Sequence, residues 1–274
     1  MKNRENELFL IAALEGAIKA SSDIMKVYAT DFLVEQKADF SPVTLADKTA
    51  DDTIRKSLDS TGEYVLSEEQ EPLEYSERKD LKFLWIVDPL DGTKEFVKRN
   101  GEFTVNIALI KNGRPVIGVI TAPAANKIWW AATDDGLNYL EVDNWNLDVN
   151  EALRTSVKQT SVNNSVKIIG SRSHANKETQ YYVNLLKAMH PDSQIINKGS
   201  SLKLCQVAMG EASYYPRFSP INEWDIAAGT ALVEISGGYV LDAASRKPVI
   251  FNKENLLQPP FIAVANGIDI NLLP

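Results

Sequence analysis

Two aspartates, three residues apart, directly follow a run of apolar residues in the first third of the chain. The run 83–87 consists of strand-forming apolar residues, which is typical of a strand buried on both faces. A proline and a glycine near Asp88 and Asp91 favour a tight turn, which would bring both carboxylates and the Leu90 carbonyl together. Such oxygens are the ligands that Mg²⁺ or Mn²⁺ prefers, often with a substrate phosphate. The segment therefore predicts a metal-dependent phosphate site.

The residues after this pair have two interpretations. A helix or turn that begins at Gly92 and Thr93 would direct free backbone N–H groups at a phosphate. Alternatively, Asp91 and Gly92 form a plain turn and Thr93 only caps a helix. The segment alone leaves both interpretations open.

Further acidic residues stand where other predicted elements begin or end. Glu68 and Glu69 follow a short strand, Asp225 opens a helix, and Asp47 lies in a Thr-x-x-Asp pattern at a helix start. Each also has a structural explanation, because glutamates after a strand are often solvated and aspartates in a first helical turn suit the helix dipole. These acids become informative only as a set.

The elements that must position these residues change in character along the chain. The first half predicts two amphipathic helices followed by strands joined by hairpin turns, and the second half alternates strands with helices. The predicted helices cover about 1–30, a segment after Pro42, 175–189, 200–209 and 224–235, and the predicted strands cover 64–66, 83–87, 103–110, 115–121, 127–132, 166–169, 194–196, 214–215, 239–241 and 261–265. The change predicts two sub-domains, residues 1–155 and 156–274.

Length and composition indicate a soluble globular protein. The 274 residues suit one large or two small domains, and 44% hydrophobic with 24% charged residues excludes disordered and fibrous classes. The net charge of −8 argues against a broad nucleic-acid surface, so a phosphorylated ligand would need local basic residues or bound cations.

Cysteine content and hydropathy bear on the compartment. The single cysteine, Cys205, cannot form an internal disulfide, and no run approaches the ~18 apolar residues of a membrane span. Glu5, Glu7 and Glu15 favour an amphipathic first helix over a signal sequence. We expect a cytoplasmic protein and leave peripheral membrane contact open.

Several segments together resemble one known superfamily. Leu66-Ser-Glu-Glu69, Trp85-Ile-Val-Asp-Pro-Leu-Asp-Gly-Thr93 and Trp224-Asp-Ile-Ala-Ala-Gly229 closely resemble the lithium-sensitive, magnesium-dependent phosphatases that include inositol monophosphatase. Within that superfamily, the bacterial adenosine 3′,5′-bisphosphate nucleotidases are similar in the segments 94–96, 98–106, 171–174, 199–203 and 215–218. Inositol monophosphatases usually carry asparagine where Glu95 stands.

The resemblance implies a fold and a metal site. The fold is of the α/β class, a layered αβαβα sandwich of two sub-domains with mixed and antiparallel sheets. Glu69, Asp88 and the Leu90 carbonyl would hold one Mg²⁺, and Asp88, Asp91 and Asp225 a second, with two or three ions per site in all. The first sub-domain would carry most of the metal ligands, and the second would complete the site and bind the nucleotide.

The resemblance also implies catalytic and substrate-binding residues. Asp47 and Thr93 would activate a water. The residues expected to contact substrate are Glu69, Leu90, Asp91, Gly92, Thr93, His174, Gly199, Lys203, Arg217 and Asp225. On their own, His174 could cap its helix and Lys203 could be a solvated helix position.

The implied function is magnesium-dependent hydrolysis of adenosine 3′,5′-bisphosphate to AMP and phosphate, with the sulfated nucleotide as a second substrate. The alternatives are an inositol-phosphate or sugar-bisphosphate phosphatase, or a non-catalytic nucleotide-binding protein. The expected partner is a small nucleotide bisphosphate and not a nucleic acid, and both a monomer and a homodimer stay open.

Overall fold

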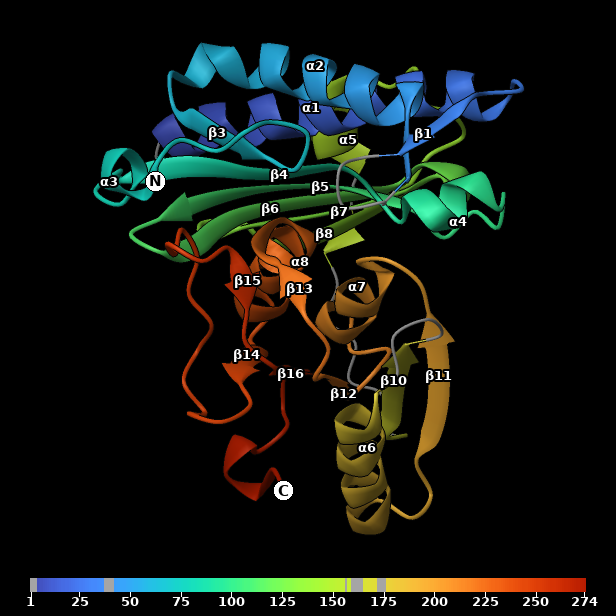
Figure 1. Cartoon of the computed structure of the whole chain (residues 1–274), viewed down its shortest axis with the longest axis vertical. Coiled ribbons are helices and arrows are strands. Elements are labelled where there is room, and N and C mark those ends of the chain that lie inside the picture. Colours follow the sequence, from blue (N-terminus) through green and yellow to red (C-terminus); the bar gives the residue numbers. More distant parts are fainter. Residues whose placement is uncertain (1–3, 37–41, 156, 159–164, 172–175) are drawn as a thin grey trace.

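Two long helices form the outermost layer of the molecule. The structure is a computed structural model that describes residues 4–36, 42–155, 157–158, 165–171 and 176–274. Helix α1 (Arg4–Tyr28) packs against α2 (Leu45–Leu58) and against the sheet beneath them (Figure 1). The predicted cap of α2 is confirmed, since Thr44 accepts a hydrogen bond from the Ala46 N–H and the Asp47 side chain accepts one from the Thr44 N–H. Within the described residues, no helix is both long and apolar enough to cross a membrane.

A seven-stranded sheet lies under these helices, and its strand order follows the chain. It contains β3 (Tyr64–Ser67), β4 (Phe83–Asp91), β5 (Thr104–Lys111), β6 (Arg114–Ala122), β7 (Lys127–Ala132), β8 (Gly136–Glu141) and β9 (Val157–Lys158). Strands β3 and β4 are parallel and every other neighbouring pair is antiparallel, as hairpin connections require. Around the sheet lie the short elements β1 (Val34–Gln36), β2 (Pro42–Thr44), α3 (Tyr75–Arg78), α4 (Thr93–Val97) and α5 (Val149–Thr155).

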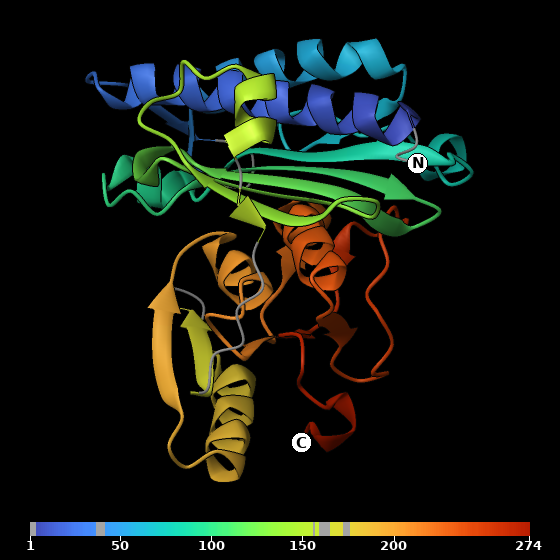
Figure 2. The same cartoon turned by 180° about the vertical axis from the view of Figure 1, so that it is seen from behind.

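The middle layer consists of α7 (Leu202–Ala208) and α8 (Glu223–Ile235), which cover the other face of the sheet (Figure 2). Helix α8 approaches β6 so closely that a Cβ on Gly118 would lie 2.5 Å from the Ala228 carbonyl oxygen. Only glycine fits there, and the close contact fixes the distance between the middle of α8 and the sheet.

A five-stranded sheet and one helix complete the layers. The sheet has the order β11-β10-β12-β16-β14. Its strands are β10 (Lys167–Ser171), β11 (Gln194–Lys198), β12 (Tyr214–Arg217), β14 (Tyr239–Asp242) and β16 (Phe261–Val264), with the small pair β13 (Ile221–Asn222) and β15 (Leu257–Gln258) beside them. Helix α6 (Lys177–Met189) packs on the outer face, at the bottom of Figure 1. Three hydrophobic cores fill the four interfaces between the five layers, because the second core includes residues from both sheets and from the helices between them.

The predicted layered αβαβα sandwich is confirmed, with some differences in its elements. The strand predicted to end before Asp88 continues to Asp91, because a bulge and not a tight turn accommodates Pro89. Strand β8 and helix α5 were not predicted. The last strand of the seven-stranded sheet ends at Lys158 and the first strand of the five-stranded sheet begins at Lys167. The division at residue 155 stays a prediction.

Candidate functional site

A β-bulge in β4 places Asp88 and Asp91 on the same face of the sheet. In a regular strand, residues three apart point to opposite faces. Here Asp88 lies opposite Asn106 and Asp91 opposite Thr104, so β4 has one residue more than β5 between these pairs. Thr104 and Asn106 are two residues apart in β5, so their side chains point to the same face of the sheet. The extra residue in β4 therefore lets the side chains of Asp88 and Asp91 point to one face as well. The Leu90 N–H donates to Asp88 Oδ1 at 3.0 Å and stabilises the bulge.

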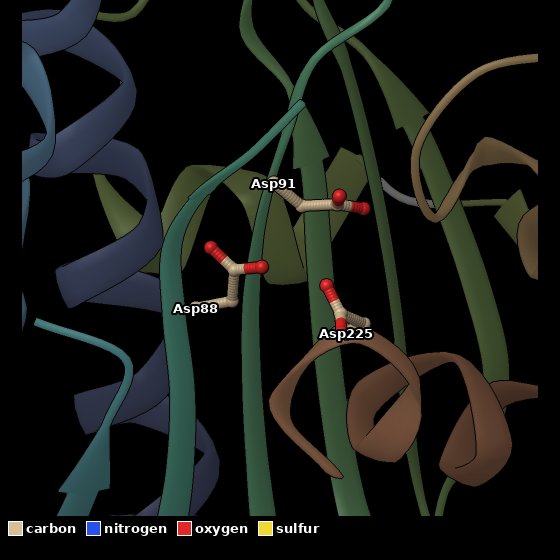
Figure 3. A group of neighbouring side chains, drawn as sticks. All are labelled: Asp88, Asp91 and Asp225. Carbon is tan, nitrogen blue, oxygen red and sulfur yellow. The ribbon is translucent and has the colours of Figure 1, made fainter. Parts of the chain in front are cut away.

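The third carboxylate comes from the first turn of α8. The Asn222 N–H donates to Asp225 Oδ2 at 2.8 Å, which anchors this side chain at the helix start. One carboxylate oxygen from each of Asp88, Asp91 and Asp225 lies within 4.8 Å of the others, and the three groups converge from strand and helix (Figure 3). We call these three residues the acidic cluster.

The acidic cluster is electrostatically unfavourable without a cation. Burial and the charges of Glu68, Asp91 and Asp225 raise the pKa of Asp88 well above its ordinary value. Burial, followed by the charges of Asp91 and Glu68, raises the pKa of Asp225 to about 8. Asp88 is 1% exposed, and its Oδ2 has no hydrogen-bond partner in the described part of the chain. A hard divalent cation fits these oxygens, since it would supply both the missing partner and the missing charge.

The neighbouring glutamates differ in their effect on the cluster. Glu68 is among the charges that raise the pKa of Asp88 and Asp225. The charge of Glu69, which the resemblance assigns to a metal, contributes to raising the pKa of Lys48. Both glutamates make further interactions, and the assignment of Glu69 to a cation stays a prediction.

Asp47 and Thr93 lie together, as the catalytic assignment requires. Asp47 is 2% exposed, and its Oδ1 accepts a hydrogen bond from Thr93 Oγ1 at 3.2 Å. Its Oδ2 accepts from the backbone and the hydroxyl of Thr44, both at 2.7 Å. The capping interpretation and the catalytic one therefore use different oxygens of the same carboxylate.

A loop before α7 reaches the cluster from the other side. Ser201 Oγ lies 2.9 Å from both Asp91 Oδ2 and the Asp225 carbonyl oxygen. Ser200 Oγ bonds to the carbonyl oxygens of Asp91 and Glu102 at 3.0 and 2.7 Å. Gly92, with φ of 92°, makes this approach possible, because a Cβ there would lie 2.2 Å from Ser200 Oγ. The sequence analysis did not single out these serines; hydroxyl residues directly after Gly199 were the available signal.

A cavity of about 510 Å³ lies beside the cluster, which is a size suited to a small molecule. Asp91, Thr93 and Asp225 line one side of it. Basic residues also line it, and they are Lys94, Lys98, Lys198, Lys203 and Arg217. The lining thus has five basic residues against four acidic ones, which are Asp91, Glu95, Glu102 and Asp225, although the protein as a whole has a net charge of −8.

The other residues predicted to contact substrate differ in whether they already have hydrogen-bond partners within the protein. The Gly199 N–H donates to Glu102 Oε2 at 3.0 Å, so it is already engaged within the protein. Lys203 donates to the Ser200 carbonyl oxygen at 2.7 Å and lies over the Tyr215 ring. Arg217 Nε is buried without a partner in the described chain. His174 lies outside the described residues.

Three other residues with reactive or aromatic side chains do not line this cavity. Cys205 is buried on α7, and burial raises the pKa of its thiol well above the ordinary value. His190 Nε2 hydrogen-bonds the Tyr214 hydroxyl at 3.0 Å at the end of α6. Trp130 is fully buried between the sheet and the first helical layer.

Comparisons with known proteins agree with one another. The model of the inositol monophosphatase family matches residues 5–267. The chain is 40% identical over 248 residues to the 3′(2′),5′-bisphosphate nucleotidase CysQ of Escherichia coli, with 89% of this chain and 95% of that protein covered. The crystal structure of CysQ from Bacteroides thetaiotaomicron, described as a bacterial member of that family, superposes with a TM-score of 0.84 at 39% identity over 94% of this chain and 97% of that one. The extragenic suppressor protein SuhB of Bartonella henselae gives a TM-score of 0.72 at 26% identity, covering 93% of each chain.

Proposed function

This chain belongs to the inositol monophosphatase family, and from that premise we propose that it is a divalent-cation-dependent phosphatase acting on adenosine 3′,5′-bisphosphate. The products would be AMP and inorganic phosphate. The name of the relatives at about 40% identity, a 3′(2′),5′-bisphosphate nucleotidase, supports this substrate class. The sulfated form of the same nucleotide is a second candidate substrate, because it carries the same 3′-phosphate.

The observation that carries the proposal is the position of the acidic cluster beside the Asp47–Thr93 pair. The cluster provides oxygen ligands in a buried site, and the pair provides a hydroxyl and a carboxylate in hydrogen-bond contact. Asp91, Asp225 and Thr93 all line the same cavity. Binding of a phosphate and activation of a water can therefore occur in one place.

The cluster and its neighbours would hold the cations. We assign this role to Asp88, Asp91, Asp225, Glu69 and the Leu90 carbonyl. The adjacent Glu68 is the alternative to Glu69, because its charge contributes to raising the pKa of Asp88 and Asp225. Two or three Mg²⁺ ions would offset the carboxylate charges. When bound, such ions polarise a phosphate and lower the pKa of a water.

Thr93 and Asp47 would remove the proton from the attacking water. The Thr93 hydroxyl is a weak base by itself, but its hydrogen bond to Asp47 allows it to accept one proton while passing its own to the carboxylate. Asp47 is held in place by its bonds to Thr44, so it can act without reorienting. Beyond this transfer, phosphoryl chemistry depends mainly on positioning and on neutralised charge.

The basic side of the cavity would bind the nucleotide. Lys203 and Arg217 line it, and we assign them to the anionic groups of the substrate, with His174 as a further candidate contact. The backbone N–H groups of Gly92 and Thr93 would bind the scissile phosphate. Gly199 would contribute by close backbone approach, because its N–H already bonds Glu102.

The proposal requires neither a nucleic-acid partner nor a membrane, and it places the enzyme in the cytoplasm as a monomer or homodimer. An inositol-phosphate or sugar-bisphosphate phosphatase would use the same acidic cluster. A non-catalytic nucleotide-binding protein would bind the ligand with Mg²⁺ and release no phosphate.

A phosphate-release assay tests the proposal directly. The panel should contain adenosine 3′,5′-bisphosphate, its sulfated form, inositol 1-phosphate and fructose 1,6-bisphosphate, each with Mg²⁺ and with EDTA. We expect the highest kcat/KM on the nucleotides and no release in EDTA. A higher kcat/KM on inositol 1-phosphate would contradict the substrate assignment, and binding without release would contradict catalysis.

A pair of variants tests the glutamate assignment. Glu69→Gln should raise the Mg²⁺ concentration needed for half-maximal rate by about tenfold or more, because a proposed cation ligand is lost. Glu68→Gln is the matched control and should change this concentration by less than about threefold. The reverse order would identify Glu68 as the ligand.

A further inference from the structure

Asn106 is a buried polar residue that none of the roles above accounts for. It lies in β5 and is 1% exposed. Neither its Nδ2 nor its Oδ1 has a hydrogen-bond partner among the residues that the structure describes. Buried side-chain amides nearly always have partners, so two unsatisfied atoms on one residue require an explanation.

The sheet register places Asn106 next to the acidic cluster. Asn106 is directly opposite Asp88 in the antiparallel β4–β5 pair, and such residues share a face with their Cβ atoms about 5 Å apart. Ala108, two residues along β5, belongs to the core packed against α8, so the Asn106 side chain faces the layer that supplies Asp225. On its other side Asn106 is paired with Ile120 of β6, which offers no polar side-chain atom.

Asp88 and Asn106, which lie opposite each other, both have buried polar atoms without hydrogen-bond partners among the described residues. Asp88 Oδ2 is buried and unpartnered, as are both polar atoms of Asn106. A buried amide without partners costs stability, and leucine, which has the same branching, would avoid that cost. A divalent cation with hydration water on Asp88 would bring donors and acceptors to both residues.

We propose that Asn106 is a positioning residue for the cation site, whose amide gains its hydrogen-bond partners around Asp88 when a divalent cation and its water are bound. The inference rests on the proposed cation site and adds a residue to it. Asn106 orients the Asp88 carboxylate and raises cation affinity, and it makes the cation-free protein less stable.

The test compares Asn106→Leu with the wild type and with Asn138→Leu. Asn138 is the matched control, because it is 2% exposed in β8 of the same sheet and its Nδ2 already donates to Asp135 and to the Gly136 carbonyl. Binding of Mn²⁺ alone is measured by electron paramagnetic resonance without substrate. We expect Asn106→Leu to raise the Mn²⁺ dissociation constant by about tenfold or more, and Asn138→Leu to leave it unchanged.

The outcomes separate this inference from the proposed function. If the wild type binds Mn²⁺ and Asn106→Leu binds it equally well, the role of Asn106 is wrong and the cation site stands. If the wild type binds no Mn²⁺, the cation site itself is wrong, and the role of Asn106 with it. Asn106→Ala repeats the measurement should the leucine variant fail to fold.

Thermal unfolding in EDTA provides a second readout. Asn106→Leu should have a Tm equal to that of the wild type or higher by roughly 3 °C, because it removes an unsatisfied amide. Asn138→Leu should have a lower Tm, because it breaks existing hydrogen bonds. A lower Tm for Asn106→Leu than for Asn138→Leu would show that the Asn106 amide is structural, and the inference would fail.

Discussion

Two acidic residues in the first turn of α8 have opposite surroundings. Glu223 is fully buried, and its carboxylate accepts hydrogen bonds from the Asn252 and Lys253 N–H groups at 2.6 and 3.1 Å, with Lys253 Nζ at 3.2 Å. Asp225, two residues later, accepts one backbone bond and otherwise faces the carboxylates of the acidic cluster. Burial raises the pKa of Glu223 above its ordinary value, although Lys253 and the two backbone N–H groups lower it, whereas the charges of Asp91 and Glu68 add to burial in raising the pKa of Asp225. Two positions on one helix thus contain a largely compensated and an uncompensated buried charge.

The compensated charge belongs to a network that joins distant parts of the chain. Asn252, which bonds Glu223, also accepts a hydrogen bond from Arg78 Nη1 at 2.6 Å and donates to the Arg78 carbonyl oxygen at 2.8 Å. Arg78 is in α3, so the network connects the first sheet layer to the segment after β14. A buried charge with such partners holds the fold together and needs no ligand.

The uncompensated charges indicate a different purpose. Carboxylates that raise the pKa of one another destabilise the folded protein unless a cation is bound. Such an arrangement is expected at a functional site, where residues that bind a ligand lower the stability of the ligand-free protein.

The largest effect is expected for Asp91→Asn. This variant removes a proposed cation ligand that also bonds Ser201, so kcat/KM on the nucleotide should fall by about a thousandfold, or about 4 kcal/mol. The variant should stay folded, since it relieves repulsion within the cluster. Steady-state kinetics at saturating Mg²⁺ and circular dichroism measure the two effects. Wild-type turnover at saturating Mg²⁺ would contradict the role of the cluster.

Glu223→Ala should instead affect stability. It leaves two backbone N–H groups without their acceptor and removes the counter-charge of the Lys253 ammonium, which keeps its bonds to Leu257 and Gln258. The free energy of unfolding should fall by about 3 kcal/mol. Urea unfolding measures the loss, and a Glu223→Ala, Lys253→Met double variant should recover part of it. The folded variant should keep its kcat within about threefold. Full stability with lost turnover would reverse the assignment of the two acids.

The sequence predicted much of the layer arrangement and the composition of the site, but not its register. Amphipathic periodicity and hairpin turns led to the main helices and strands, and the Asp88–Asp91 spacing indicated a metal site. The bulge could not be predicted, because the direction of Asp91 depends on pairing with Thr104 in another strand. The choice between Glu68 and Glu69 likewise depends on how one turn is oriented in the folded molecule.

Residues supplied by distant segments escaped prediction for the same reason. Ser201 contacts Asp91 across 110 positions of sequence, and Asn106 is notable only because Asp88 lies opposite it. Neither has a local pattern that distinguishes it from an ordinary helix cap or strand residue. Sequence patterns therefore identified the residues that carry charge, and the fold was needed to identify those that orient them.

Metal-free stability should depend on pH through the acidic cluster. Because the pKa of Asp225 is about 8 in the folded protein and 3.8 is its ordinary value, the folded state favours the protonated form. The contribution of Asp225 to the stability of the folded protein is fully present below about pH 4 and is lost as pH rises toward 8.

In EDTA, Asp225→Asn should remove much of this pH dependence. The variant should be more stable than the wild type at pH 8, by on the order of 2 kcal/mol. Thermal unfolding from pH 5 to 8 measures this, and Mg²⁺ should restore wild-type stability at pH 8. Equal slopes for variant and wild type would show that Asp225 is compensated like Glu223.

Glu102 lies between the two extremes and should give the smallest effect. Its carboxylate accepts a hydrogen bond from the Gly199 N–H at 3.0 Å and lies 3.9 Å from Lys198 Nζ, and its side chain is 15% exposed. It therefore has partners, as Glu223 has, yet it lines the cavity, as the acidic cluster does. Glu102→Ala should loosen the loop that carries Ser200 and Ser201 and raise the KM for the nucleotide about fivefold, or about 1 kcal/mol, with kcat changed less. Glu102→Gln keeps an acceptor for the Gly199 N–H and should recover most of the loss. If both variants lower kcat as strongly as Asp91→Asn does, the distinction between residues that hold the cation and residues that only position the loop does not apply at this site.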